Sequence, residues 1–218
     1  GKIVRIYANI GNVEDAKAAI CGDAEGIGLM RSEFLYLGRE DYPSEQELYT
    51  AYRSVVDTMQ GKPVIVRTID IGADKRADYL GLKEEENPAL GERGIRFCLS
   101  REDVFRTGLR AIYRAAAGGP VSIMFPMIAS AWEVEKARSI CESVEAELTA
   151  QGIAHGKPEI GVMIETPAAA ICSEQLAQMV DFISVGTNDL TQYLLAADRQ
   201  NAAVMPYCDP HHPAVLNM

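Results

Sequence analysis

Short apolar runs rich in β-branched residues alternate along this chain with longer amphipathic stretches of helical periodicity. The runs predict six strands, at residues 2–8, 25–30, 63–66, 121–127 and the first halves of 160–167 and 182–190. The intervening stretches predict helices at about residues 12–20, 44–60, 100–117 and 130–151, and further helices that begin near residues 166 and 188.

Most of these predicted helices begin at a residue whose side chain can cap the first turn. Ser44 and Ser130 each open a Ser-x-x-Glu capping box, and Ser100 begins a similar acidic pattern. Thr166 precedes a proline that suits the first helical position, and Asn188 is a good cap residue. We therefore expect the free N–H groups after Asn188 to point beyond the end of the sixth strand.

Six strands that are each followed by a helix or a loop indicate a parallel α/β fold, which is either an open doubly wound sheet or a barrel. Polar side chains concentrate at the carboxyl ends of the strands, which favours a (β/α)8 barrel of the TIM type. The 218 residues supply about six of its eight βα units. Residues 1–218 are thus expected to be one barrel domain that is incomplete at its C-terminal side. The long connection after the third strand, which carries Asp74 and Lys75, is of a length typical of functional loops.

Two carboxylates, Glu165 and Asp189, follow the last two predicted strands. If these strands are parallel neighbours, both side chains leave the sheet at one edge and can converge on a single hard cation. Mg²⁺ suits such a pair because it keeps several waters and takes further ligands from substrate oxygens. Either carboxylate alone is better explained as a polar cap of a loop, so the prediction of a metal site depends on the pair.

Arginines at other strand ends predict an anion site. Arg31 and Arg67 end the second and third strands, and Arg93 and Arg199 lie in nearby loops. Guanidinium groups match the oxygens of a phosphate, and the helix start at Asn188 adds N–H donors. The alternative is that these arginines pair with some of the 31 acidic residues.

The composition narrows the classes of function. Hydrophobic residues make up 48% and charged residues 24% of the chain, which is ordinary for a globular protein. The net charge of -10 and the lack of a basic run argue against a nucleic-acid or anionic-membrane partner. Five scattered cysteines without zinc spacing indicate reduced thiols in the cytoplasm. No apolar run approaches the roughly 18 residues of a membrane helix.

Several long segments closely resemble the phosphoenolpyruvate-binding barrel of enzyme I of the bacterial sugar phosphotransferase system. The segments are residues 28–35 (GLMRSEFL), 64–72 (VIVRTIDIG), 86–93 (ENPALGER), 123–127 (IMFPM), 161–167 (GVMIETP), 184–193 (SVGTNDLTQY) and 198–199 (DR). The resemblance extends over nearly the whole chain.

The resemblance implies a Mg²⁺-dependent phosphoenolpyruvate-protein phosphotransferase, which passes phosphate to its own histidine and then to a histidine-containing phosphocarrier protein. It also implies a cytoplasmic homodimer. By position, the arginines Arg31, Arg67 and Arg93 would hold the phosphate. Asn188 would also contact the phosphate, and Arg199 would contact the anionic groups of the substrate. Glu165 and Asp189 would be the metal ligands.

Two segments of the family are not matched in this sequence. None of the three histidines, His155, His211 and His212, lies in the family's Thr-Ser-His context, and Cys208 does not match the catalytic Gly-x-Cys-Gly-Glu segment. We therefore expect the phosphohistidine domain to be absent, and we expect the isolated chain to bind phosphoenolpyruvate without turning it over. Alternatives are the barrel of pyruvate phosphate dikinase or phosphoenolpyruvate synthase, a Mg²⁺-dependent carbon-carbon lyase, and a binding fragment without catalysis.

Overall fold

Six parallel strands form one sheet whose order follows the chain, β1-β2-β3-β4-β5-β6, in a computed structural model that describes residues 3–72 and 78–218. The strands are β1 (Ala8–Ile10), β2 (Ile27–Arg31), β3 (Val64–Arg67), β4 (Val121–Phe125), β5 (Glu159–Ile164) and β6 (Phe182–Val185). The predicted loop residues Asp74 and Lys75 lie outside the described residues.

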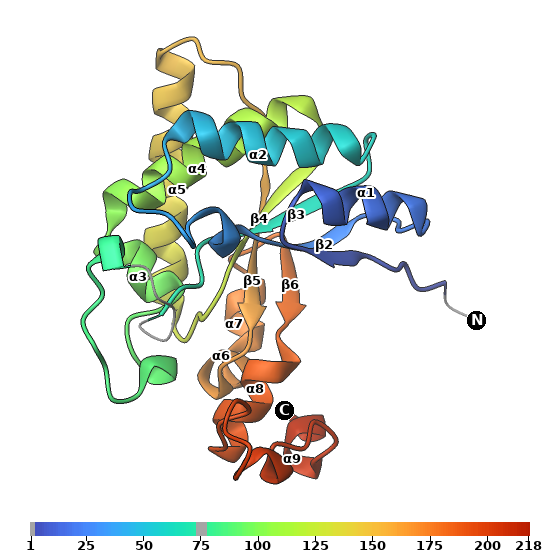
Figure 1. Ribbon diagram of the computed structural model, residues 1–218, viewed down its shortest axis with the longest axis vertical. Coiled ribbons are helices and arrows are strands. Elements are labelled where there is room, and N and C mark those ends of the chain that lie inside the picture. The colour runs from blue at the N-terminus through green and yellow to red at the C-terminus, as the bar shows by residue number, and fades with distance from the viewer. Residues whose placement is uncertain (1–2, 73–77) are drawn as a thin grey trace.

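This strand order decides between the two predicted architectures. In a doubly wound sheet the order of the strands reverses at a switch point. Here each strand pairs with the next one along the chain. The sheet also curls, so that β5 and β6 run at a steep angle to β1 and β2 (Figure 1). A curled parallel sheet in chain order is the arrangement of a (β/α)8 barrel over six of its units, and the predicted fold class is confirmed.

Helices lie over the outer face of the curled sheet and, in the C-terminal part of the chain, beyond the ends of β5 and β6 (Figure 1). Their bounds are α1 (Val13–Cys21), α2 (Glu45–Thr58), α3 (Ile95–Ser100), α4 (Glu102–Ala115), α5 (Ala131–Ala150), α6 (Pro167–Ile171), α7 (Ser173–Ala177), α8 (Thr187–Leu195) and α9 (Pro213–Asn217). Short 3-10 helices include η1 (Ser32–Leu35) and η3 (Pro88–Leu90). Within the described residues, no helix combines the length and the apolar character that crossing a membrane requires.

Three of the predicted helix starts are confirmed. Ser44 accepts a hydrogen bond from the Glu47 N–H, and the Glu47 carboxylate accepts one from the Ser44 N–H at 2.8 Å. α5 begins directly after Ser130, whose N–H donates to Glu133. The Thr166 hydroxyl accepts from the N–H of Ala169, the third residue of α6, and a proline occupies the first helical position.

Three local predictions were wrong. The strand expected at residues 2–8 begins only at Ala8, because Ile3 and Val4 have no face to bury against and are 95% and 78% exposed. Ser100 ends α3, an unpredicted helix, and does not cap α4. Asn188 is not a cap either, because Gly186 still pairs with β5 and α8 starts at the next residue.

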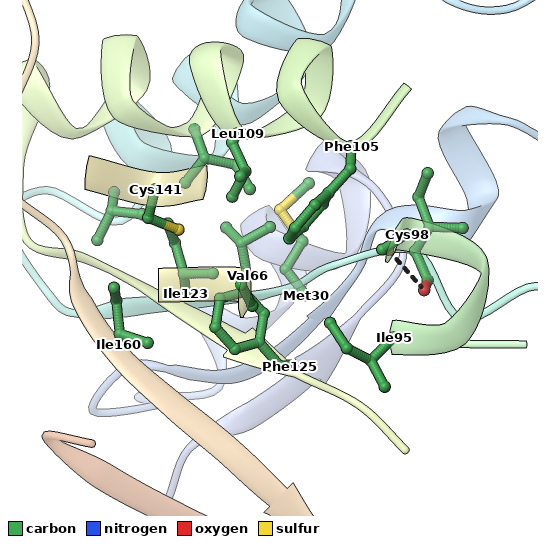
Figure 2. Packing of buried hydrophobic residues seen from close by; sticks show 14 of the residues in the cluster. Met30, Val66, Ile95, Cys98, Phe105, Leu109, Ile123, Phe125, Cys141 and Ile160 are labelled. Atoms are coloured by element: carbon green, nitrogen blue, oxygen red, sulfur yellow. Dashed lines mark hydrogen bonds between the residues drawn. The ribbon is translucent and has the colours of Figure 1, made fainter. Parts of the chain in front are cut away.

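The core lies between the sheet and helices α2, α4 and α5. Figure 2 shows Phe105 and Leu109 of α4 above Phe125 and Ile123 of β4. The rings of Phe105 and Phe125 meet edge to face with centroids 6.0 Å apart. This packing fixes the strands from outside, so their carboxyl ends present polar side chains at defined positions.

Candidate functional site

A cavity of about 630 Å³ lies at the carboxyl ends of the strands, and eight of the residues that line it are charged. Four are the arginines Arg31, Arg67, Arg93 and Arg199, and four are the carboxylates Glu33, Asp70, Glu165 and Asp189. Asn188 also lines it. The structure therefore brings all seven predicted site residues together, while their roles as ligands stay a prediction.

Arg67 is held between two carboxylates at the end of β3. Its side chain forms ion pairs with Glu33 at 2.7 Å and with Asp70 at 3.2 Å, and all three groups are buried. Burial acts against the charge of Arg67, but Asp70 and Glu33 outweigh it and raise the pKa of the guanidinium. Register places Arg31 of β2 directly beside Arg67. Two arginines therefore lie next to each other at the carboxyl ends of β2 and β3.

Arg93 reaches the same cavity from the loop between β3 and α3. Its Nε and Nη2 atoms donate to Asp70 at 2.9 to 3.1 Å, and its Nη1 donates to the Tyr193 hydroxyl at 3.2 Å. Nη2 also lies 3.7 Å from the Asp189 carboxylate. Asp70 therefore links Arg67 and Arg93, and the two guanidinium groups are oriented before any ligand binds.

Glu165 and Asp189 are buried carboxylates whose negative charges are only partly balanced by hydrogen-bond donors and cations. Glu165 is 1% exposed and accepts a hydrogen bond from the Met127 N–H at 2.6 Å. Burial, and then the nearby charges of Asp70 and Asp189, raise the pKa of Glu165 to about 8. The Oδ1 atom of Asp189 has no hydrogen-bond partner, and its nearest cation is Arg199 at 3.5 Å. Such a pair of hard oxygen donors gains stability from a cation.

The N-terminal end of α8 supplies neutral donors beside these carboxylates. The first bond of the helix runs from the Leu190 N–H to the Gly186 carbonyl at 3.0 Å. The N–H groups of Thr187 and Asn188 precede that bond, and both residues line the cavity. Although Asn188 is not the cap, it lies in the first turn of α8, where its backbone N–H has no partner within the helix.

Arg31 and Arg199 are less constrained than the two central arginines. The guanidinium of Arg31 stacks over the Phe34 ring at 4.9 Å, and its Nε is buried without a hydrogen-bond partner. The side chain of Arg199 is 42% exposed, while its backbone N–H donates to the Gln192 amide oxygen at 3.0 Å. Both can therefore adjust to a ligand.

Sequence reasoning missed the residues that orient the arginines. Glu33 and Asp70 follow the strand-end arginines Arg31 and Arg67 by two and three positions, a local signal that could have identified them. Tyr193 and Gln192 are four and three positions after Asp189. Tyr193 contacts Arg93, 100 positions away, and that contact cannot be read from spacing.

Comparison with known families accounts for this arrangement. The profile of the family described as "PEP-utilising enzyme, PEP-binding domain" matches residues 1–218. The chain belongs to this family of phosphoenolpyruvate-binding domains. The resemblance to the phosphoenolpyruvate-binding barrel of enzyme I is thereby confirmed.

Curated relatives of this phosphoenolpyruvate-binding domain are longer proteins. The chain is 51% identical over 218 residues to a multiphosphoryl transfer protein of Rhodobacter capsulatus, covering 100% of this chain and 26% of that protein. It is 50% identical over 216 residues to the phosphoenolpyruvate-protein phosphotransferase of Geobacillus stearothermophilus, covering 99% and 37%. With the Haemophilus influenzae phosphotransferase it shares 46% identity over 219 residues, covering 100% and 38%. The chain thus spans well under half the length of these relatives.

A solved citrate lyase structure from Burkholderia xenovorans LB400 has a similar fold. Its TM-score is 0.51 at 16% identity, and the match covers 99% of this chain and 59% of that one. Identity at this level shows the fold alone, so it supports the barrel architecture of the phosphoenolpyruvate-binding domain and says nothing of lyase chemistry.

Proposed function

We propose that this chain binds phosphoenolpyruvate together with Mg²⁺, as the substrate-binding part of a phosphoenolpyruvate-protein phosphotransferase. The observation that carries the proposal is the cavity in which four arginines face four carboxylates. When all eight groups are ionised their charges cancel, so a divalent cation on the carboxylates leaves the cavity positively charged and attractive to a small polyanion. Phosphoenolpyruvate, which carries a phosphate and a carboxylate, is a small polyanion of this kind.

The residues of this chain divide the recognition between them. Arg31, Arg67 and Arg93 hold the phosphate, and Asn188 contributes a donor from the first turn of α8. Arg199, at the more exposed side of the cavity, contacts the anionic groups of the substrate. Because Glu33 and Asp70 already orient the central guanidinium groups, little reorganisation is needed on binding.

Mg²⁺ fits the donor set of this site. Glu165 and Asp189 would hold it, and both are oxygen donors, one with a buried oxygen that lacks a hydrogen bond. Among the described residues, no group of three or more His, Cys, Asp or Glu side chains could hold a metal, so substrate oxygens and water would complete the ligands. When bound, the cation supplies charge neutralisation to an oxygen-rich anion.

The remaining expectations concern the whole protein. Transfer of the phosphoryl group from phosphoenolpyruvate to a protein is supported by the names of the curated relatives. Its passage through a histidine to a phosphocarrier protein is supported by the resemblance to enzyme I. The cytoplasmic location, the role in sugar transport and the homodimer have the support of that resemblance alone. Among the described residues, no histidine lines the cavity, so the acceptor must come to the site from elsewhere.

Radiolabelled phosphoenolpyruvate tests this function in the full-length protein that contains the chain. With Mg²⁺ and no nucleotide, we expect an acid-labile phosphoprotein and release of pyruvate. Labelling that requires a nucleotide would instead indicate a dikinase or a synthase. Citrate cleavage without any labelling would indicate a lyase.

A further inference from the structure

The hydroxyl group of Tyr193 joins three strand-end segments that are distant in the sequence. It accepts a hydrogen bond from Arg93 Nη1 at 3.2 Å and donates one to the Ala89 carbonyl of η3. The Met127 sulfur lies 3.9 Å from it, in the segment that also supports Glu165. Tyr193 itself belongs to α8, so one oxygen atom connects the sixth strand end to the loops after β3 and β4.

Two hydrogen-bond partners orient Arg93, in addition to the longer ion pair of its Nη2 with Asp189 at 3.7 Å. Asp70 binds its Nε and Nη2 atoms, and Tyr193 binds its Nη1 atom. If Asp70 were the only hydrogen-bond partner, the guanidinium of Arg93 could rotate about that contact, because its Nη1 atom would not be held. The hydrogen bond from Nη1 to Tyr193 fixes the plane of the guanidinium group.

Only a neutral hydroxyl can make both contacts at once. It must donate to the Ala89 carbonyl and accept from Arg93, which requires both the proton and a lone pair. Burial raises the pKa of Tyr193 in spite of the opposing charge of Arg93, so the hydroxyl keeps its proton. Phenylalanine retains the ring packing and loses both contacts.

We propose that Tyr193 is a positioning residue that fixes Arg93 relative to α8, the helix that carries Asn188 and Asp189. This inference rests on the proposed binding of phosphoenolpyruvate. Arg93 lies in the segment that connects β3 to α3, and Tyr193 lies 100 positions further along the chain. Its hydroxyl therefore sets the distance between a phosphate-binding arginine and the metal-binding end of the site.

The test compares Tyr193→Phe with Tyr113→Phe in the full-length protein that contains the chain. Tyr113 is a buried tyrosine of α4 that does not line the cavity, so it controls for loss of a buried hydroxyl. We expect Tyr193→Phe to raise the dissociation constant for phosphoenolpyruvate roughly tenfold, as befits a lost hydrogen bond to a charged group. Its melting temperature should fall no further than that of Tyr113→Phe, and the affinity of the control should be unchanged.

A double-mutant cycle with Arg93→Lys separates positioning from a general structural role. Lysine cannot form the fork, so adding Tyr193→Phe to Arg93→Lys should weaken binding no further. A full and additive loss in the double variant would overturn the proposal. So would an unchanged affinity of Tyr193→Phe alone.

Hydrogen–deuterium exchange provides a readout that does not require substrate. Residues 88–94 should exchange faster in Tyr193→Phe than in the wild type or in Tyr113→Phe. If wild-type protein fails to bind phosphoenolpyruvate, the proposed function is wrong, whereas unchanged exchange of this segment would show that Tyr193 does not anchor it.

Discussion

Replacing Gly186 with alanine should disturb the metal-binding end of the site through steric contact alone. Gly186 lies between β6 and α8 with φ −88° and ψ 79°, close to the inverse γ-turn conformation that is common at strand ends and does not require glycine. An added Cβ would stand 2.7 Å from the Glu165 Cβ, 2.8 Å from its Oε2 and 2.9 Å from the Met163 sulfur. One methyl group would therefore press directly on a proposed metal ligand.

The size of the effect follows from these distances. Carbon atoms in contact stand about 3.5 to 4.0 Å apart, so Glu165 and the Gly186 backbone must separate by roughly 1 Å. Overpacking of this kind costs about 1–3 kcal/mol of folding stability. A displacement of about 1 Å at a site can cost roughly 10²-fold in function. We expect the affinity for Mn²⁺, used as a spectroscopic probe in place of Mg²⁺, to fall by at least tenfold.

The assay is Mn²⁺ binding followed by electron paramagnetic resonance, together with thermal unfolding of the same samples. Gly22→Ala is the matched control, because its added Cβ would meet nothing closer than the Ala18 carbonyl at 3.4 Å. The reasoning fails if Gly186→Ala and Gly22→Ala bind Mn²⁺ equally tightly, whether or not both bind it more weakly than the wild type.

Three further predictions address the metal, the phosphate site and the fold. Glu165→Gln should weaken Mn²⁺ binding in calorimetry because it removes a charged oxygen donor, and unchanged affinity would exclude Glu165 as a ligand. Arg67→Lys should weaken phosphoenolpyruvate binding by at least about tenfold, since an ammonium cannot span a phosphate and two carboxylates; equal affinity in a titration would refute this. Glu45→Gln should lower the melting temperature near neutral pH. Although burial opposes ionisation of Glu45, hydrogen bonds from Arg110 and Arg114 lower its pKa, so its stabilising effect is present above its ordinary pKa of about 4.3 and is lost at lower pH. An equal difference between wild type and variant at neutral and acid pH would contradict the pairing.

The strand ends could be predicted from sequence because their signals are local. Glu165 follows β5 directly, Arg31 and Arg67 are the last residues of β2 and β3, and Asp189 comes four residues after β6. Parallel strands end at one edge, so the convergence of these residues required no knowledge of distant contacts. The capping boxes at residues 44–47 and 130–133 were equally local.

What the sequence did not reveal depends on contacts between distant segments. The pairing of Glu33 with Arg67 requires the register that sets β2 beside β3, and the contact of Tyr193 with Arg93 joins residues 100 positions apart. The preference of asparagine for the cap position was also overridden at Asn188, because the sheet pairing of Gly186 determines where the helix starts. The apolar alternation near residue 4 resembled a strand, yet those side chains have no core beneath them.

Calorimetric titration of the chain with phosphoenolpyruvate, in the presence of Mg²⁺ and again with a chelator, tests the central claim most directly. We predict saturable binding of one phosphoenolpyruvate per chain with Mg²⁺, a much weaker interaction with the chelator, and loss of this difference in Glu165→Gln. Binding that is equally strong without Mg²⁺ and in Glu165→Gln, or no binding at all, would contradict the assignment of this cavity.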